Sequence, residues 1–63
     1  MALTKKEKEV ANLLLEGLNS QEIAEKLYIS KFTVLTHRKR LLKKLNAKNT
    51  AEMMKILIAT KLE

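Results

Sequence analysis

The stretch YISKFTVLTHRKRLLKKLNAK, residues 28–48, predicts a helix with one apolar side and one cationic side. Val34, Leu41 and Leu45 recur at helical spacing, so that side is expected to be buried. From residue 31 to residue 48 the stretch carries seven Lys or Arg residues and no acid. The whole chain has a net charge of +6, so the remaining residues sum to −1. Because the positive charge is local, it favours binding of a polyanion over a merely solvated helix face.

Length and composition exclude several classes of protein. The 63 residues make one domain, expected to span residues 1–63, with a small core. The absence of Cys removes disulfides and thiolate metal sites, and the lone His37 cannot form a metal cluster, so no cofactor is expected. No apolar run approaches the roughly 20 residues that cross a membrane, and no signal peptide is visible. We therefore expect a cytoplasmic protein with no membrane partner.

The ends of the chain carry a separate expectation. Met1-Ala2 and Leu62-Glu63 have the character of residues added by cloning. The sequence is therefore compatible with a fragment of a longer protein.

Four segments are predicted to be helical. The chain has no Pro and a single Gly, and a residue able to cap a helix precedes each segment: Thr4, Asn19, Ser30 and Asn49. Three of these caps are followed three residues later by a glutamate, as in a capping box. Gly17 and Asn46 suit the left-handed residue that ends a helix. The sequence therefore predicts an all-α fold with helices over about residues 4–16, 20–27, 31–45 and 50–60.

The junction between the second and third segments predicts a helix-turn-helix. The second helix ends near Leu27, and only a short turn separates it from Ser30, a spacing at which two helices cross steeply. Tyr28 stands in this turn, where many such motifs have Gly. The residues expected to be buried around the turn are Ile23, Ala24, Leu27, Ile29 and Val34. A plain helical hairpin would produce the same spacing, so this motif by itself leaves both arrangements open.

Four stretches together resemble a known family. LTKKEKEV (residues 3–10), GLNSQEIAEKL (17–27), ISKFTVLTH (29–37) and KKLN (43–46) resemble the DNA-binding domain of LuxR/NarL/FixJ-type bacterial transcription regulators. The resemblance runs in order from residue 3 to about residue 60. It implies a four-helix helix-turn-helix domain whose third helix enters the major groove and whose fourth helix often mediates dimerisation. It also implies the output domain of a response regulator or sensor-regulator, with RNA polymerase as a further partner.

This chain departs from the family's pattern at three positions. Lys6 stands where Arg is usual, and Asn46 stands where Gly is common. Gln21 replaces a lysine that often touches phosphate, so we expect a neutral hydrogen bond to DNA there.

The third helix presents the residues expected to read bases. At about 100° per residue, Phe32, Thr36, Lys39, Arg40 and Lys43 lie opposite Val34 and should enter or border the groove. By resemblance, the positions of Leu35, Thr36 and Lys39 are the usual base readers, and Arg40 joins them as a candidate. Lys and Arg suit guanine edges, and Thr suits a base or a methyl group. Leu35 has two interpretations, contact with a thymine methyl group or a place at the edge of the core.

A second set of residues is expected to contact phosphate. Ser30 and Thr33 stand at the start of the third helix, where free amides and the helix dipole favour an anion. Lys44 lies nearer the core and has an alternative partner in a glutamate of the first or second helix. Arg38 is expected to lay its stem on the core and reach a phosphate or a carboxylate. The complete set of phosphate candidates is Gln21, Ser30, Lys31, Thr33, Arg38, Lys43 and Lys44.

Two further features are interpreted structurally. His37 falls beside the apolar stripe, which favours a packed, hydrogen-bonded histidine over a base reader. The fourth helix is apolar over about 220° of its circumference, more than one packing side requires. The excess predicts weak homodimerisation on DNA, and the candidate contacts are Ala51, Met54 and Ile58.

Other functions were weighed against DNA regulation. Region four of a bacterial sigma factor has a similar opening and the same motif, but His37 and the additional apolar helix favour the LuxR-type interpretation. A protein-interaction module would use the basic side against an acidic partner. The residues do not assemble a carboxylate pair, a nucleophile with its base or a glycine-rich phosphate loop, so an enzyme is not expected, nor a small-molecule ligand.

Overall fold

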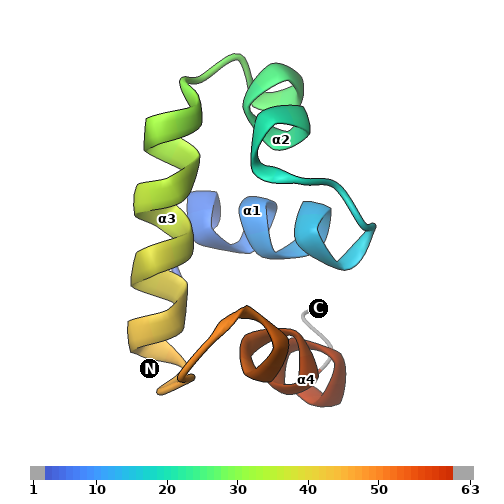
Figure 1. Cartoon of the computed structure of the whole chain (residues 1–63), viewed down its shortest axis with the longest axis vertical. Coiled ribbons are helices and arrows are strands. Elements are labelled where there is room, and N and C mark those ends of the chain that lie inside the picture. Colours follow the sequence, from blue (N-terminus) through green and yellow to red (C-terminus); the bar gives the residue numbers. More distant parts are fainter. Residues whose placement is uncertain (1–2, 61–63) are drawn as a thin grey trace.

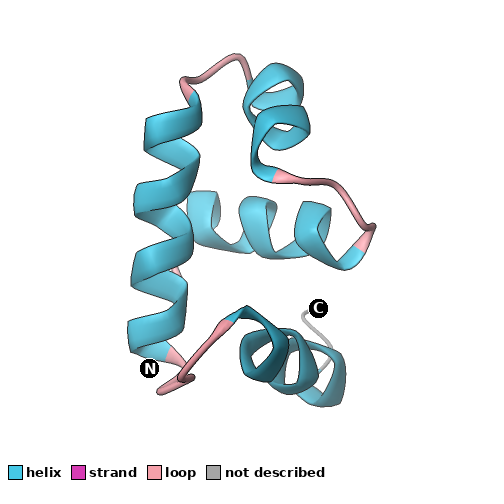
Figure 2. Cartoon of the chain, in the orientation of Figure 1, coloured by secondary structure: helices cyan, strands magenta, loops and turns pink. Residues whose placement is uncertain are grey.

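The computed structural model describes residues 3–60, which fold into four helices (Figure 1). They are α1 (Lys5–Leu15), α2 (Ser20–Leu27), α3 (Lys31–Lys44) and α4 (Thr50–Thr60). The described residues contain no strand, so the predicted all-α class is confirmed (Figure 2). Each helix begins and ends within one residue of its predicted bounds. Residues 1–2 and 61–63, which include both terminal pairs expected to be additions, lie outside the described residues.

Capping side chains begin the helices as their spacing predicts. In α1 the Thr4 hydroxyl accepts a bond from the Glu7 amide (3.1 Å), and the Glu7 carboxylate accepts one from the Thr4 amide (2.9 Å). Asn19 and Glu22 form the same reciprocal pair at the start of α2. These bonds satisfy backbone amides that have no partner inside the helix.

The start of α4 differs from the predicted capping box. Asn49 accepts a bond from the Glu52 amide at 2.8 Å, as expected. The Glu52 carboxylate, however, accepts its bond from the Lys48 amide at 3.0 Å and not from the Asn49 amide. The predicted donor to Glu52 was therefore wrong by one residue. The side chain of Glu52 ties the preceding loop to α4 instead.

The core is formed by aliphatic side chains from all four helices. α3 runs along one edge of the molecule, and α1, α2 and α4 all lie to the same side of it (Figure 1). α3 packs against α1, α2 and α4, whereas α2 and α4, as far as the structure describes them, do not pack on each other. The buried apolar residues are Val10, Ala11, Leu13, Leu14, Ile23, Ala24, Val34, Leu41, Met53 and Leu57. Half of α3 is therefore structural, and its other half faces solvent.

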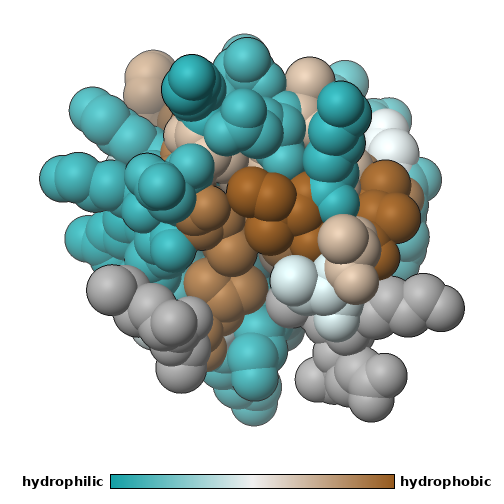
Figure 3. All heavy atoms as spheres, turned by 90° about the horizontal axis from the view of Figure 1, so that it is seen from below, coloured by the Kyte–Doolittle hydropathy of each residue, from teal (hydrophilic) through white to brown (hydrophobic). Residues whose placement is uncertain are grey.

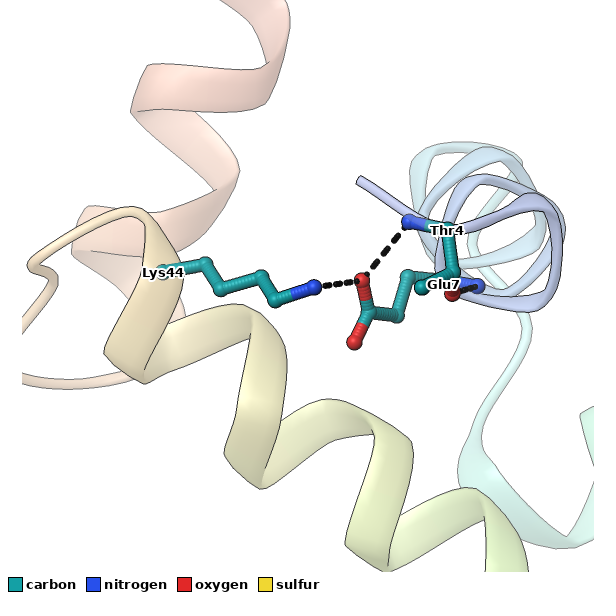
Figure 4. Close-up of polar contacts among 3 residues, drawn as sticks. All are labelled: Thr4, Glu7 and Lys44. Atoms are coloured by element: carbon teal, nitrogen blue, oxygen red, sulfur yellow. Dashed lines mark hydrogen bonds and ion pairs between the residues drawn. The ribbon is translucent and has the colours of Figure 1, made fainter. Parts of the chain in front are cut away.

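An ion pair joins the start of α1 to the end of α3. The Lys44 ammonium lies 2.8 Å from a Glu7 carboxylate oxygen, and the same oxygen accepts the bond from the Thr4 amide (Figure 4). The Glu7 side chain is only 2% exposed, and that of Lys44 is 25% exposed. The hydrogen bond from Lys44, followed by the bond from the Thr4 amide, lowers the pKa of Glu7 although burial opposes this. The alternative partner expected for Lys44 is confirmed.

Glu7→Gln should lower the free energy of unfolding by about 2 kcal/mol, because the amide still caps α1 but leaves Lys44 without its counter-ion. This loss is smaller than that for a fully buried pair, since Lys44 remains a quarter exposed. In the parent, the stabilisation should be present at neutral pH. It should disappear as the pH falls below about 4.5 through the lowered pKa of Glu7. Urea unfolding measured at several pH values would test both expectations.

Glu22→Gln is the matched control, because Glu22 makes the same capping bond to Asn19 on an exposed surface. This substitution should change the free energy of unfolding by no more than about 0.5 kcal/mol. Equal losses for the two variants would mean that the capping bond, and not the ion pair, carries the effect.

The turn between α2 and α3 places a tyrosine in left-handed backbone. Tyr28 has φ 56° and ψ 43°, and its side chain is 95% exposed. The following amide, that of Ile29, bonds back to the Ala24 carbonyl at 3.0 Å and closes the end of α2. The turn therefore requires a conformation that Gly adopts readily and that Tyr adopts at a cost.

Tyr28→Gly should raise the free energy of unfolding by about 0.5–1 kcal/mol, because it removes the left-handed penalty and little packing. Tyr28→Ala keeps the Cβ atom and should give no such gain. Thermal or urea unfolding of the two variants beside the parent would measure the difference. An equal gain for both would assign the effect to loss of the exposed ring.

Candidate nucleic-acid interface

The solvent side of α3 brings the predicted DNA-contacting residues together. Val34 and Leu41 are fully buried and hold the helix against the core. The residues on the other side are exposed: Lys31, Phe32, Thr33, Leu35, Thr36, Lys39, Arg40 and Lys43. Among the described residues of α3 none is acidic, so this surface carries uncompensated positive charge. The helix is thus both rigidly supported and cationic on its free side.

The four candidate base readers all lie on this surface. Leu35 is 42% exposed, which agrees with both of its interpretations, a place at the core edge and contact with a thymine methyl group. The Thr36 hydroxyl donates to the Phe32 carbonyl at 3.0 Å, which fixes its orientation on the helix. Thr36, Lys39 and Arg40 share a shallow hollow with residues from the end of α3 and the following loop. Their contact with bases stays a prediction.

Several phosphate candidates converge where the N-termini of α2 and α3 approach. Gln21, Lys31 and Arg38 line one shallow depression together with Asn19 and Ser20. Gln21 is exposed, and its amide donates to Glu25 at 3.2 Å. The depression combines two cations with the first turn of α2, where free amides favour an anion.

Ser30 and Thr33 form the start of α3. The Ser30 hydroxyl caps the helix by accepting a bond from the Thr33 amide at 3.1 Å. The two hydroxyl groups also lie 3.0 Å apart and share a hydrogen bond. Both side chains remain exposed, so the capping role is present while their contact with phosphate stays a prediction.

Arg38 has partners that the sequence did not indicate. Its guanidinium donates to the Ser20 hydroxyl of α2 and to the Thr50 hydroxyl of α4, the latter at 3.2 Å. Neither partner is a carboxylate, so of the two expected partners, a phosphate or a carboxylate, the phosphate stays a prediction. Ser20 is only 6% exposed, so Arg38 satisfies a buried hydroxyl and links two helices that do not otherwise pack together. Donors of the guanidinium beyond these two bonds still allow contact with phosphate.

His37 is packed but not fully hydrogen-bonded. The side chain is half-buried on α3, as predicted. Its Nδ1 atom is buried and has no hydrogen-bond partner within the described part of the chain, so the predicted hydrogen bonding of His37 is not found at this atom.

The outer side of α4 holds the candidate dimer contacts. Met53 and Leu57 are fully buried, which leaves Ala51 and Ile58 exposed and Met54 half-buried. Figure 3 views the molecule from the side of α4 and shows hydrophobic residues gathered near the middle of this side. Ile58 is 62% exposed, so an apolar stripe lies beside the packed side of the helix.

One feature of this interface was missed at the level of sequence. It is the link from Arg38 to Ser20 and Thr50, which spans three helices and has no local pattern. The exposure of Phe32, a residue type that is usually buried, was predicted by its wheel position opposite Val34. None of the described helices is long and apolar enough to cross a membrane.

Comparison with known proteins identifies similar sequences. Residues 1–57 match the family described as "Bacterial regulatory proteins, luxR family". The chain is 38% identical over 60 residues to the oxygen regulatory protein NreC of Staphylococcus carnosus, which is 95% of the chain and 28% of that relative. It is 46% identical over 50 residues to the C4-dicarboxylate transport transcriptional regulatory protein DctR of Rhodobacter capsulatus, 79% of the chain and 25% of the relative.

A third relative is the tetrathionate response regulatory protein TtrR of Salmonella typhimurium. It is 42% identical over 53 residues, which cover 84% of the chain and 26% of that protein. The chain therefore spans about a quarter of the length of these relatives. No solved structure matches the chain.

Arg38→Ala should lower the free energy of unfolding by about 2 kcal/mol, because it leaves the buried Ser20 hydroxyl without a partner. In a double-mutant cycle, Ser20→Ala should cost little once Arg38 is absent. Arg40→Ala, an exposed arginine two residues along the same helix, is the matched control and should stay within about 0.5 kcal/mol. Additive losses at Ser20 and Arg38 in urea unfolding would contradict this link.

Proposed function

The chain belongs to the luxR family of bacterial regulatory proteins and corresponds to its DNA-binding domain; we propose that it binds double-stranded DNA sequence-specifically, with α3 in the major groove. The observation that carries this proposal is the exposed side of α3, which carries Lys and Arg residues and no acidic residue, opposite the fully buried Val34 and Leu41. An α-helix fits the width of the major groove, and in helix-turn-helix proteins the second helix of the motif occupies it.

Specific contacts would come from the middle of α3. Lys39 and Arg40 carry donors that match the O6 and N7 acceptors of guanine, and both are exposed. Thr36 offers a methyl group and an acceptor oxygen, because its hydroxyl proton is directed to the Phe32 carbonyl. Leu35 is exposed enough to reach a thymine methyl group.

Contacts with the sugar-phosphate backbone would position the domain. Lys31 and Gln21 lie in one depression at the N-terminal ends of α3 and α2, where helix amides favour phosphate. Lys43 lies at the other end of α3 and is exposed. Lys44 is a weaker candidate, because its ammonium is paired with the buried Glu7.

Two copies would read two half-sites. The exposed apolar stripe of α4, with Ala51, Met54 and Ile58, supports a weak homodimer on DNA, and a symmetric pair requires a two-fold repeated operator. As a domain spanning about a quarter of its relatives, it would serve as the output part of a cytoplasmic bacterial regulator. Contact with RNA polymerase belongs to the same proposal.

Selection from a random-duplex library tests the proposal. The parent should enrich a half-site, in a two-fold repeat if the domain dimerises. Lys39→Ala should lose preference at one base position, with a cost of about 10-fold or more in affinity for that site. Lys8→Ala, an exposed lysine of α1, is the control and should leave the enriched sequence unchanged.

The salt dependence of binding provides a second measure. If about four phosphates are neutralised per domain, the logarithm of affinity should fall against the logarithm of salt concentration with a slope near −3.6. Equal binding to every duplex, abolished by salt, would contradict sequence reading and reduce the basic side to a general electrostatic surface. No binding to any duplex would instead direct attention to an acidic protein partner.

A further inference from the structure

The exposed side of α3 contains large apolar side chains as well as cations. Phe32 is 79% exposed and Leu35 is 42% exposed, and they stand three residues apart on the same helix. The core meanwhile contains only aliphatic side chains, so the one phenylalanine of the chain lies outside it. Phe is among the residues most often buried, and its position here leaves a large apolar area facing the proposed DNA.

The chemistry of this side changes along the helix. Its N-terminal part presents Phe32, Leu35 and the methyl group of Thr36, whose hydroxyl proton is directed to the Phe32 carbonyl. Its C-terminal part presents Lys39, Arg40 and Lys43, all exposed. Lys31 and Thr33 are exposed at the same end, so the N-terminal half is mixed and carries the apolar side chains, whereas the C-terminal half is cationic.

The two halves suit different bases. In the major groove the thymine C5-methyl group is the apolar feature of the base edges, whereas guanine offers two acceptors to Lys or Arg. Phe32 and Lys39 are seven residues apart, which at 1.5 Å per residue is about 10 Å along the helix axis. A helix in the major groove is inclined to the duplex axis, so this length spans at most about three base pairs of 3.4 Å each. One half of α3 can therefore meet thymines while the other meets guanine.

We propose that Phe32, with Leu35, determines specificity by packing on thymine methyl groups, so that each half-site carries thymine beside the start of α3 and guanine within about three base pairs of it. This inference rests on the proposed function and gives the half-site a direction. Removal of one buried methyl group should weaken binding about three- to four-fold.

The test uses the half-site selected by the parent. Each thymine is replaced in turn by deoxyuracil, which removes only the C5-methyl group and keeps the base pair. At one or two positions the parent should lose three- to four-fold in affinity per methyl group. For Phe32→Ala, the difference between thymine and deoxyuracil should disappear at the position nearest the start of α3, while the preference for guanine remains.

Tyr28→Ala is the matched control, because Tyr28 is equally aromatic and 95% exposed but stands in the turn before α3. It should keep the full difference between thymine and deoxyuracil. Phe32→Ala should fold normally, since the side chain is 79% exposed, and helical circular dichroism would verify this.

The possible outcomes separate this inference from the proposed function. If the parent selects no sequence, the proposed function fails. If it selects a half-site in which deoxyuracil replaces every thymine without loss, sequence reading stands and the role of Phe32 is overturned. An equal loss of discrimination in Phe32→Ala and Tyr28→Ala would likewise overturn it, because a general effect of exposed rings would then be sufficient.

Discussion

The position of α3 depends on the ion pair between the buried carboxylate of Glu7 and Lys44. The carboxylate accepts bonds from the Thr4 amide, which starts α1, and from Lys44, which lies at the end of α3. One side chain thus begins the first helix and holds the last turn of the proposed recognition helix against it. A carboxylate that is 2% exposed is stable in its charged form only with such partners, and its lowered pKa reflects them.

Arg38 likewise ties the middle of α3 to neighbouring helices. Its bonds to Ser20 and Thr50 reach α2 on one side and α4 on the other. Because α2 and α4 do not pack together in the described structure, this guanidinium holds both helices in a fixed orientation relative to α3. A domain of 63 residues buries a smaller fraction of its surface than a larger domain does, so polar links between helices add to the stability of a small core.

Local signals in the sequence were enough to predict the helices, but they were not enough to predict the tertiary contacts. The spacing of Thr4 to Glu7 and of Asn19 to Glu22 predicts helix starts because a capping box involves only four consecutive residues. The partner of Lys44 was predicted only as a class, a glutamate of the first or second helix. The hydroxyl partners of Arg38 and the unpaired Nδ1 of His37 depend on helix crossing angles, which no short pattern encodes. The exposure of Phe32 was foreshadowed by its place opposite Val34.

The cations between residue 31 and residue 48 fall into two groups, those bonded within the fold and those exposed to solvent. Seven cations suggest a strongly electrostatic surface, yet Lys44 is neutralised by Glu7 and Arg38 is held by two hydroxyl groups. The cations of the stretch that are exposed are Lys31, Lys39, Arg40, Lys43 and Lys48. Lys44 therefore adds little to the field that a DNA duplex would meet, whereas Arg38 keeps its charge because its hydroxyl partners are neutral. The apolar side chains of Phe32 and Leu35 lie on the same surface, and because phosphate contacts carry no sequence information, net charge alone cannot set which bases such a surface would prefer.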